Sequence, residues 1–469
     1  MHALTPPLRF CLCAAALLAA LSPVARATNG MDMEGYGPVA TALGGASMAF
    51  DNGTAAVINN PATLTLMPTA SRLDVALGIL GPDVKATAPN GATAKSEATA
   101  FFMPAIGYVR RSGDLVYGLG VFGQGGMGCQ YSGDTWRGLG FGLENRTEVS
   151  VGRVIAPLAW KVNDQLSVAA TADFIWAGMD LKMAMPGSQF MDLVTPTSQV
   201  FGRASGSIVQ SFGQIMQQMP AGTSVDYAYF NFCNGNPFTG AAKGYGYAGK
   251  IGLIYTPRPD LTVGLTYHTE TELSDLKAAG RSISFQLNVP GMGHIPQTLT
   301  GDIRVRDFEW PALLAGGVAW TPAPDWMVAA DVRHVFWSNV MQNFDLAFVA
   351  ANTSANGNFA GQTLDAQLYQ RWSDQTIVQV GVAHVVNKQL TVRLGANHGN
   401  DPIPAFYLNC LFPATVETHL TAGFTWRVSD ASSIDVSYVH GFQHTVTNGG
   451  GISISHAQNN AQVMYSYAF

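Results

Sequence analysis

Charged residues are scarce in this 469-residue chain. Asp, Glu, Lys and Arg make up 12% of it and hydrophobic residues 47%, whereas soluble domains carry about 25% charged residues. Long hydrophobic runs are also missing beyond the N-terminus, because no later stretch approaches the roughly 18 consecutive apolar residues that a transmembrane helix needs. These two scarcities leave a large globular protein or a membrane-spanning β-barrel as the alternatives.

Cysteines and basic stripes are scarce as well. Cys11 and Cys13 lie in an N-terminal apolar run, and only Cys129, Cys233 and Cys410 follow it. Three cysteines allow one disulfide at most, in a pairing that the sequence leaves open, and they show no metal-ligand spacing. The net charge is −6. Because the sequence also contains no stripe of basic residues, we expect no nucleic-acid partner.

The N-terminus has the organisation of a secretory signal peptide. Arg9 precedes an apolar run over residues 10–21, and Ala25-x-Ala27 has the form of a cleavage signal. The apolar run is too short to be a membrane-spanning helix. We therefore expect residues 1–27 to be a signal peptide that is removed on secretion.

Alternation of apolar and polar residues predicts β-strands. In residues 261–268 the apolar side chains occupy the odd positions, and in residues 390–397 the even ones. In residues 434–444, this pattern puts His440 and His444 on the apolar, outward face. Side chains of a strand alternate with period two, so one face of each strand meets an apolar surrounding and the other a polar one.

Short turns alternate with long loops along the chain. Six tight turns join strand-like runs, at residues 111–114, 163–165, 257–260, 322–325, 387–389 and 429–432. Longer, Gly-rich polar stretches separate them, at residues 81–97, 127–146, 183–243, 277–307, 341–375, 398–414 and 445–451. The sequence therefore predicts an all-β transmembrane antiparallel barrel of about 14 strands over residues 69–469, because short turns at one rim and long loops at the other are typical of bacterial outer-membrane barrels.

Aromatic residues gather beside the short turns, where a girdle at the membrane interface is expected. Its expected members are Trp160, Tyr255, Trp320, Trp326, Trp426, Tyr465 and Tyr467. The last strand alternates and ends at Phe469, an ending that resembles the signal by which barrel proteins reach the outer-membrane assembly machinery. We expect that machinery, outer-membrane lipids and lipopolysaccharide to be partners of a monomeric barrel.

Residues 28–68 lack strand alternation and are rich in Gly and Ala. Their Asn60-Pro61-Ala62 element is suited to a stiff turn, because Asn tolerates unusual backbone angles and Pro fixes φ. A wide barrel leaves a lumen to be filled or left open. We predict that residues 28–68 form a hatch that plugs the lumen, with Asn60, Pro61 and Ala62 in a gating role.

The chain resembles the FadL/TodX family of outer-membrane transporters for long-chain fatty acids and hydrocarbons over essentially its whole length after the signal peptide. The resemblance rests on residues 35–37, 42–49 and 55–62, and on weaker matches at 244–247, 265–270, 401–404 and 437–441. It implies a barrel with an N-terminal hatch. It also implies capture of the ligand by extracellular loops, transfer to a site inside the barrel, and exit sideways through a gap at a kinked third strand.

Two groups of residues are candidates for these steps. The third strand runs into glycines that mark either the lateral opening or an ordinary loop start, namely Gly123, Gly125 and Gly126. The longest loop holds an apolar stripe at helical spacing that either captures greasy ligands or packs the loop, formed by Ile208, Phe212, Ile215 and Met219.

The ligand class depends on cations inside the barrel. Fatty-acid members of the family place a basic residue there, and near such a position the fifth strand of this chain has Gly178. Arg333 and Arg393 lie on inward faces of other strands; they either substitute for that residue or pair with Asp331 and Asp173. Long-chain fatty acids are the expected ligands, and uncharged aromatic or aliphatic hydrocarbons are the alternative.

Enzyme motifs are missing from the chain. It has no G-x-S-x-G elbow, no H-E-x-x-H pair and no phosphate-binding loop. We therefore expect no enzyme activity, no cofactor and no metal site, and diffusion without energy input. An outer-membrane lipase and a hydrophilic porin stay open as remote alternatives, although an open aqueous pore has no use for a plug.

Overall fold

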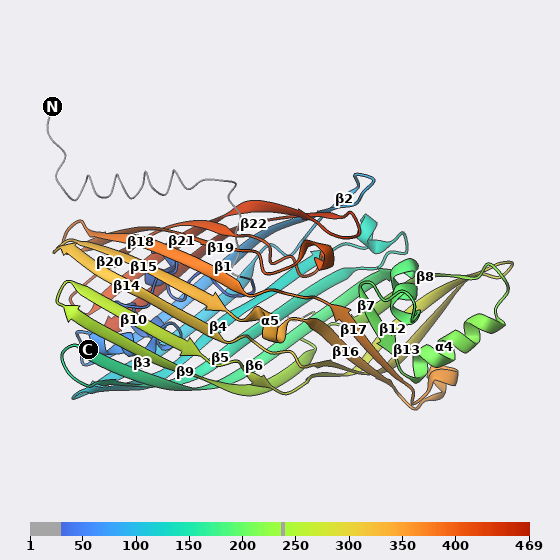
Figure 1. Ribbon diagram of the computed structural model, residues 1–469, viewed down its shortest axis with the longest axis horizontal. Helices are drawn as coiled ribbons and strands as arrows, with labels where there is room; N and C mark the ends of the chain where they lie inside the picture. The colour runs from blue at the N-terminus through green and yellow to red at the C-terminus, as the bar shows by residue number, and fades with distance from the viewer. Residues whose placement is uncertain (1–29, 236–239) are drawn as a thin grey trace.

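The computed structural model describes residues 30–235 and 240–469. The predicted signal peptide, residues 1–27, lies outside the described residues. In the described ranges, 22 strands are hydrogen-bonded into one continuous sheet. Most of them form an elongated barrel, and the rest extend from one of its ends (Figure 1).

The barrel is a closed antiparallel ring. Each strand pairs with the next in the order below, and β22 pairs again with β1. Its strands are β1 (Ser71–Thr87), β3 (Phe101–Ser112), β4 (Leu115–Tyr131), β5 (Asn145–Lys161), β6 (Leu166–Pro186), β9 (Ala242–Arg258), β10 (Leu261–His268), β14 (Leu313–Ala323), β15 (Trp326–Val335), β18 (Gln375–Val385), β19 (Leu390–Gly399), β20 (Thr418–Arg427), β21 (Ser432–Thr447) and β22 (Ser453–Ala468).

Further strands continue the sheet beyond the rim that carries the long loops. They pair in the order β6–β8–β12–β13–β16–β17–β7. Their bounds are β7 (Gly202–Ser205), β8 (Ser224–Phe232), β12 (Leu276–Val289), β13 (Gly293–Arg306), β16 (Asn343–Ala350) and β17 (Thr363–Tyr369), and two short strands are β2 (Thr93–Lys95) and β11 (Glu272–Leu273).

The predicted count of about 14 strands covers the closed ring but leaves out eight further strands of this sheet of 22. Six of these eight strands, β7, β8, β12, β13, β16 and β17, lie in or at the edge of residues 183–243, 277–307 and 341–375, which the sequence indicates as loops. Most of these strands pair with one another beyond the barrel, and their apolar side chains face the interior of the loops, for example Phe344, Leu346 and Phe348, which are all buried.

Helices are short and confined to the N-terminal segment and the long loops. The α-helices are α2 (Pro38–Thr41), α3 (Gly187–Val194), α4 (Ser207–Gln218) and α5 (Trp337–Val340). The 3-10 turns are η1 (Gly53–Val57), η2 (Pro61–Leu66), η3 (Trp136–Gly138), η4 (Ser354–Phe359) and η5 (Ala405–Tyr407). The apolar stripe in the longest loop correctly predicts helix α4.

All six predicted short turns are confirmed, because each joins two consecutive barrel strands. Their local chemistry explains why they are readable. The Asn163 side-chain oxygen accepts hydrogen bonds from the backbone N–H groups of Gln165 and Leu166, both at 2.8 Å. Asn387 caps its own turn in the same way, as Asn side chains commonly do.

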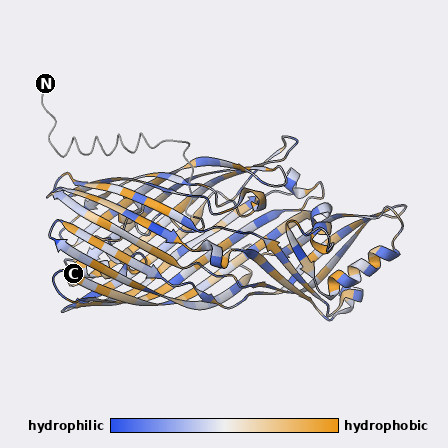
Figure 2. Cartoon of the chain, viewed as in Figure 1, coloured by the Kyte–Doolittle hydropathy of each residue, from blue (hydrophilic) through white to orange (hydrophobic). Residues whose placement is uncertain are grey.

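Large apolar side chains lie exposed on the outer face of the barrel. They include Val75, Leu77, Ile79, Ile106, Leu119, Leu158, Ile251, Leu265, Val332, Leu394, Leu420 and Val463. Figure 2 shows such residues recurring along the barrel strands. Of the expected girdle, Trp160, Tyr255, Trp426, Tyr465 and Tyr467 are exposed, and Trp320 and Trp326 are half-buried. An apolar band with aromatic rims matches the hydrocarbon core of a membrane.

The N-terminal segment, residues 30–70, lies inside the ring of strands (Figure 1). The backbone N–H of Ser47 donates to Asp331 on β15 at 2.6 Å, and that of Gly44 donates to Thr421 on β20 at 2.9 Å. Gly44 has a φ of +72°, and a Cβ there would lie 2.4 Å from the Ala396 carbonyl oxygen on β19. Only glycine allows this approach of segment and wall.

Candidate functional site

A cavity of about 690 Å³ lies where the N-terminal segment meets β1, β3, β4 and β5. Its lining is mostly apolar, with Met31 and Met33 from the segment and Phe101, Val149 and Val151 from the strands. Ligand pockets of about 300–1,000 Å³ with mainly hydrophobic walls are typical of sites for small molecules. The cavity is therefore the candidate ligand site.

The wall beside this cavity is interrupted. The β3–β4 ladder ends at the pair Ala105–Phe122, and the next backbone link runs from the Glu97 N–H to the Gln130 carbonyl at 2.8 Å. We call this gap the window. It follows from the sequence at Pro104, which has no N–H to donate to a ladder.

The cavity extends through the window. Its lining includes Phe102 and Val121, whose side chains alternate onto the outer face of β3 and β4, together with Met31 and Asp32 from inside the barrel. Phe102 is 50% exposed. One continuous cavity thus reaches from the lumen towards the outer surface of the barrel.

The N-terminal segment covers the edge of β4 at the window. Asp32 forms an isolated antiparallel bridge with Gly125, and the Gly126 N–H donates to the Met31 carbonyl at 3.2 Å. The Tyr36 hydroxyl donates to the Gln124 carbonyl at 2.5 Å. Through these contacts the segment pairs with the edge of β4 at residues 124–126, whereas β3 pairs with the same edge at residues 115–122.

Asp32 is held by partners from the opposite wall. Its carboxylate accepts a hydrogen bond from the Trp310 indole at 2.9 Å and pairs with Arg333 at 3.4 Å. Burial raises the pKa of the Asp32 carboxyl above its ordinary value, while the Arg333 guanidinium and the Trp310 N–H act in the opposite direction. The charge pair therefore fixes the segment across the lumen.

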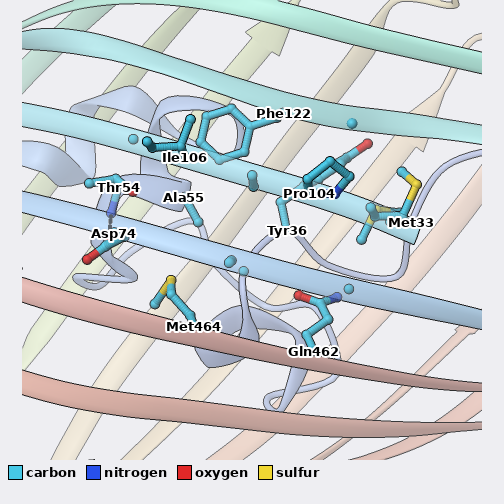
Figure 3. A pocket seen from close by; sticks show the side chains of 17 residues that line it. Met33, Tyr36, Thr54, Ala55, Asp74, Pro104, Ile106, Phe122, Gln462 and Met464 are labelled. Carbon is cyan, nitrogen blue, oxygen red and sulfur yellow. Dashed lines mark hydrogen bonds between the residues drawn. The ribbon is translucent and has the colours of Figure 1, made fainter. Parts of the chain in front are cut away.

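A smaller cavity of about 30 Å³ lies next to the window, between the N-terminal segment and β1, β3 and β22 (Figure 3). Met33 and Tyr36 line it from the N-terminal segment, and Phe122 lines it from β4. A water needs roughly 10–15 Å³ of such space, so this cavity has room for about two waters and for no hydrocarbon.

Charges in the large cavity are mainly negative. Asp32, Glu34, Glu97 and Glu148 line it, against the single guanidinium of Arg146. Arg146 pairs with Glu148 at 2.5 Å and donates to Gln130 at 2.9 Å. Its charge is therefore balanced within the lining.

The sequence does not predict a buried ionic cluster that Arg153, Lys250 and Asp173 form. Arg153 and Lys250 both pair with Asp173, and Arg153 also donates to Gln124. Strand parity could have found it, because both cations occupy inward positions of β5 and β9. The pairing expected for Asp173 was with Arg333 or Arg393, but it is made by these two residues.

The Asn-Pro-Ala element lies away from the window. Asn60 caps η2 by accepting from the Ala62 N–H at 3.1 Å, and its amide donates to the Met48 carbonyl at 2.8 Å and to the Leu253 carbonyl on β9 at 3.3 Å. Pro61 and Ala62 are buried beside it. The element therefore packs the segment against β9 and β10, whereas Met31 and Asp32 meet Gly125 and Gly126.

Gly123, Gly125 and Gly126 all line the large cavity. A Cβ on Gly125 would lie 2.2 Å from the Met31 carbonyl oxygen, and one on Gly126 would lie 2.0 Å from the Val149 carbonyl oxygen. A Cβ on Gly123 would meet only the flexible Met103 side chain, at 2.8 Å. Gly123 is therefore the position where the window can be filled.

The four stripe residues divide into two pairs. Ile208 and Phe212 are buried, and the Phe212 ring packs edge-on against Phe190 and Phe285 at 5.2 and 5.4 Å. Ile215 and Met219 are half-buried. The first pair is thus part of the loop core.

The lumen arginines have partners other than those expected. Arg333 pairs with Asp32, while the expected partner Asp331 accepts from the N–H groups of Ser47 and Met48. The Arg393 guanidinium donates to the Thr425 hydroxyl at 2.7 Å, and Arg393 is not among the residues that line the two cavities.

The described residues contain neither a metal-binding cluster nor a membrane-spanning helix. No group of three or more His, Cys, Asp and Glu side chains there could hold a metal ion. In the same ranges, 30–235 and 240–469, no helix is long and apolar enough to cross a membrane. Cys129, Cys233 and Cys410 are free thiols.

A closed barrel with an apolar outer face and a lumen cavity defines an outer-membrane transport protein. The chain belongs to the family described as outer membrane protein transport protein (OMPP1/FadL/TodX), whose model matches residues 16–465. It is similar in structure to the P. putida toluene transporter TodX, with 28% identity, a TM-score of 0.79 and coverage of 93% of this chain and 99% of that one.

Curated relatives agree with this assignment. The long-chain fatty acid transport protein of Escherichia coli O6:H1 is 23% identical over 417 residues, which cover 84% of this chain and 83% of that protein. A shorter match, 48% identical over 75 residues, covers 16% of this chain and 36% of an uncharacterized protein of Chlorobium limicola. The chain is thus a transport protein of the outer membrane and not an enzyme.

Proposed function

We propose that this protein lets small hydrophobic molecules, foremost uncharged hydrocarbons, diffuse passively into the outer membrane through the window between β3 and β4. The observation that carries the proposal is the cavity of about 690 Å³, whose lining continues from Met31 inside the barrel to Phe102 on its outer face. A molecule that leaves through this window enters the apolar part of the membrane without crossing a polar layer.

The charges of the cavity favour an uncharged ligand. A fatty-acid carboxylate entering it would meet four acidic side chains and one guanidinium that is already paired. Burying an unpaired charge is strongly unfavourable. Toluene, after which the P. putida transporter TodX is described, carries no charge and has no such cost.

Long-chain fatty acids are the second candidate. They were the first expectation from the sequence, and they are what the name of the Escherichia coli relative specifies. A fatty acid could lie with its chain in the cavity and its carboxylate towards Arg146. This binding mode requires Arg146 to exchange Glu148 for the ligand.

We further propose that residues 28–68 act as a hatch. Asn60, Pro61 and Ala62 fix it to β9 and β10, and Met31 and Asp32 close the window along β4. The cavity of about 30 Å³ beside it is too small to hold a hydrocarbon. Ligand capture at the extracellular side is assigned to Ile215 and Met219, the half-buried pair of the α4 stripe.

Filling the window tests the proposal. Gly123→Leu places a side chain in the gap, where only Met103 has to move. Gly316→Leu on the outer face of β14 is the matched control, because a Cβ there has ordinary contacts from 3.4 Å. Entry of labelled toluene and oleate into cells is measured for both variants.

We expect Gly123→Leu to abolish toluene entry and Gly316→Leu to preserve it, with both barrels equally heat-resistant in detergent. If toluene entry survives in folded Gly123→Leu, the ligand passes along the lumen and lateral exit is wrong. If only the entry of a sugar changes, the hydrophilic-porin alternative is correct. Entry that is insensitive to energy poisons is the result expected for passive diffusion.

A further inference from the structure

Three cations stand in a row across neighbouring strands on the outer surface. Lys277 on β12 is the register partner of Lys243 on β9 and of Arg304 on β13. All three side chains are exposed. Directly opposite residues of paired strands share one face of the sheet. Because strands lie about 4.8 Å apart, the row spans about 10 Å.

No ion pair within the described chain neutralises the row. None of the three residues forms an ion pair in residues 30–235 and 240–469, and the remaining residues contain no Asp or Glu. The nearby carboxylate of Asp302 accepts from the Gly280 N–H at 3.1 Å. Like charges on opposite strand positions destabilise a sheet, and an anion bound across the row relieves that repulsion.

The row lies at the level of the lipid headgroups. On the outer face of β9, Lys243 is followed by Tyr245 and Tyr247, which are 56% and 70% exposed and pack with Phe174 on β6. Such a cluster is typical of the aromatic girdle at a membrane interface.

The length of β9 also places Lys243 at the level of the lipid headgroups. Tyr255 lies twelve positions after Lys243 on β9, beside a short turn at the other rim. That separation is about 40 Å along the strand and about 30 Å in height at a tilt of 35–45°. The apolar band of such barrels is about 25 Å tall. Lys243 therefore stands just beyond it, on the side of the long loops.

We propose that Lys243, Lys277 and Arg304 bind the phosphate groups of a phosphorylated glycolipid of the outer leaflet, the chemistry of lipopolysaccharide. A guanidinium can hold a phosphate through two hydrogen bonds, and lysines add point charges. The lipid's acyl chains then lie against the exposed rings of Tyr245 and Tyr247. This site is separate from the window and does not depend on which molecule the barrel transports.

The test compares two variants that lose the same charge. Lys243→Ala, Lys277→Ala and Arg304→Ala are combined in one barrel. The control combines Arg110→Ala, Lys388→Ala and Arg427→Ala, which removes three exposed cations beside the short turns. Both proteins are delipidated in detergent, and their affinities for bis-phosphorylated lipid A are measured by thermophoresis.

We expect the first variant to bind at least about tenfold more weakly, since one charge-assisted hydrogen bond is already worth that factor, and the control to bind like the parent. Without lipid, the first variant should unfold at no lower temperature, because a repulsion is removed. If it does not fold, Lys277→Gln alone serves, with a smaller loss expected.

Three outcomes would overturn the proposal. Equal affinity of the folded variant and the parent means that the row is not the site. Equal affinity for dephosphorylated lipid A means that phosphate is not recognised. Displacement of the lipid by millimolar inorganic phosphate as effectively as by lipid A itself means that the site takes free phosphate and not a lipid headgroup.

Discussion

Asp32 is the residue through which closure of the window can be measured. Its carboxylate joins the N-terminal segment to Trp310 and Arg333, and its backbone pairs with Gly125. Asp32→Ala removes the acceptor and the charge but keeps the backbone pairing. We therefore expect the segment to leave the β4 edge more often while the barrel stays closed.

The size of the effect follows from burial. Arg333 and Asp32 are 6% and 4% exposed, and breaking a buried pair by removing one partner costs about 3–5 kcal/mol. If about 3 kcal/mol of this falls on the closed position of the segment, its open population rises by about two powers of ten. Facilitated entry of toluene should then accelerate.

Hydrogen exchange at the Gly126 amide is the direct assay, because that N–H donates to the Met31 carbonyl. Its exchange should become about a hundredfold faster in Asp32→Ala. Asp83→Ala is the control, since Asp83 pairs with Lys95 at 3.0 Å with both side chains more than half exposed, where pairs contribute about 0–1 kcal/mol.

Adding Arg333→Met to Asp32→Ala separates the release of the N-terminal segment from the destabilisation caused by an unpaired Arg333. It removes the unpaired cation, so thermal stability should recover while Gly126 still exchanges fast. Unchanged exchange and unchanged toluene entry in Asp32→Ala would refute the view that Asp32 holds the segment on β4.

Two further variants test the ligand class. Glu148→Gln frees the Arg146 guanidinium in the cavity, so decanoate affinity should rise about tenfold or more while toluene entry stays the same; equal decanoate affinity would remove Arg146 from consideration. Arg393→Ala should leave oleate affinity unchanged in a displacement assay, because Arg393 donates to Thr425 and lies outside both cavities. A tenfold loss of oleate affinity would instead show that Arg393 contacts the ligand.

Local chemistry explains what the sequence predicts well. In turns such as Asn163-Asp164-Gln165, a side chain of the turn accepts hydrogen bonds from nearby backbone N–H groups. The period-two alternation of side chains follows from the pleated backbone of a single strand. For that reason the six short turns, the outward girdle at Trp160 or Tyr465 and helix α4 can all be predicted from local sequence, without knowledge of tertiary contacts. The family resemblance rests on equally local motifs.

A bulge in β21 shows where the alternation of inward and outward side chains cannot be predicted from the sequence. His440 and His444 are expected on one outward face, but the β21–β22 register shifts between Gly441 and His444. His444 is buried, and its Nδ1 lies 2.7 Å from the Thr415 carbonyl oxygen. One extra residue in a strand exchanges its two faces, and whether a strand bulges depends on its neighbour.

The sequence by itself determined the class of fold, the short turns and the outward and inward faces of most strands, because each depends on residues near one another in the chain. Only the tertiary structure decided which inward residues meet. Asp32 and Arg333 are 301 positions apart, and they pair because ring closure and strand stagger bring β15 opposite the N-terminal segment. The window likewise consists of hydrogen bonds that β3 and β4 do not make. Pro104 marks in the sequence where one donor is missing, but only the fold decides that the N-terminal segment pairs with β4 there.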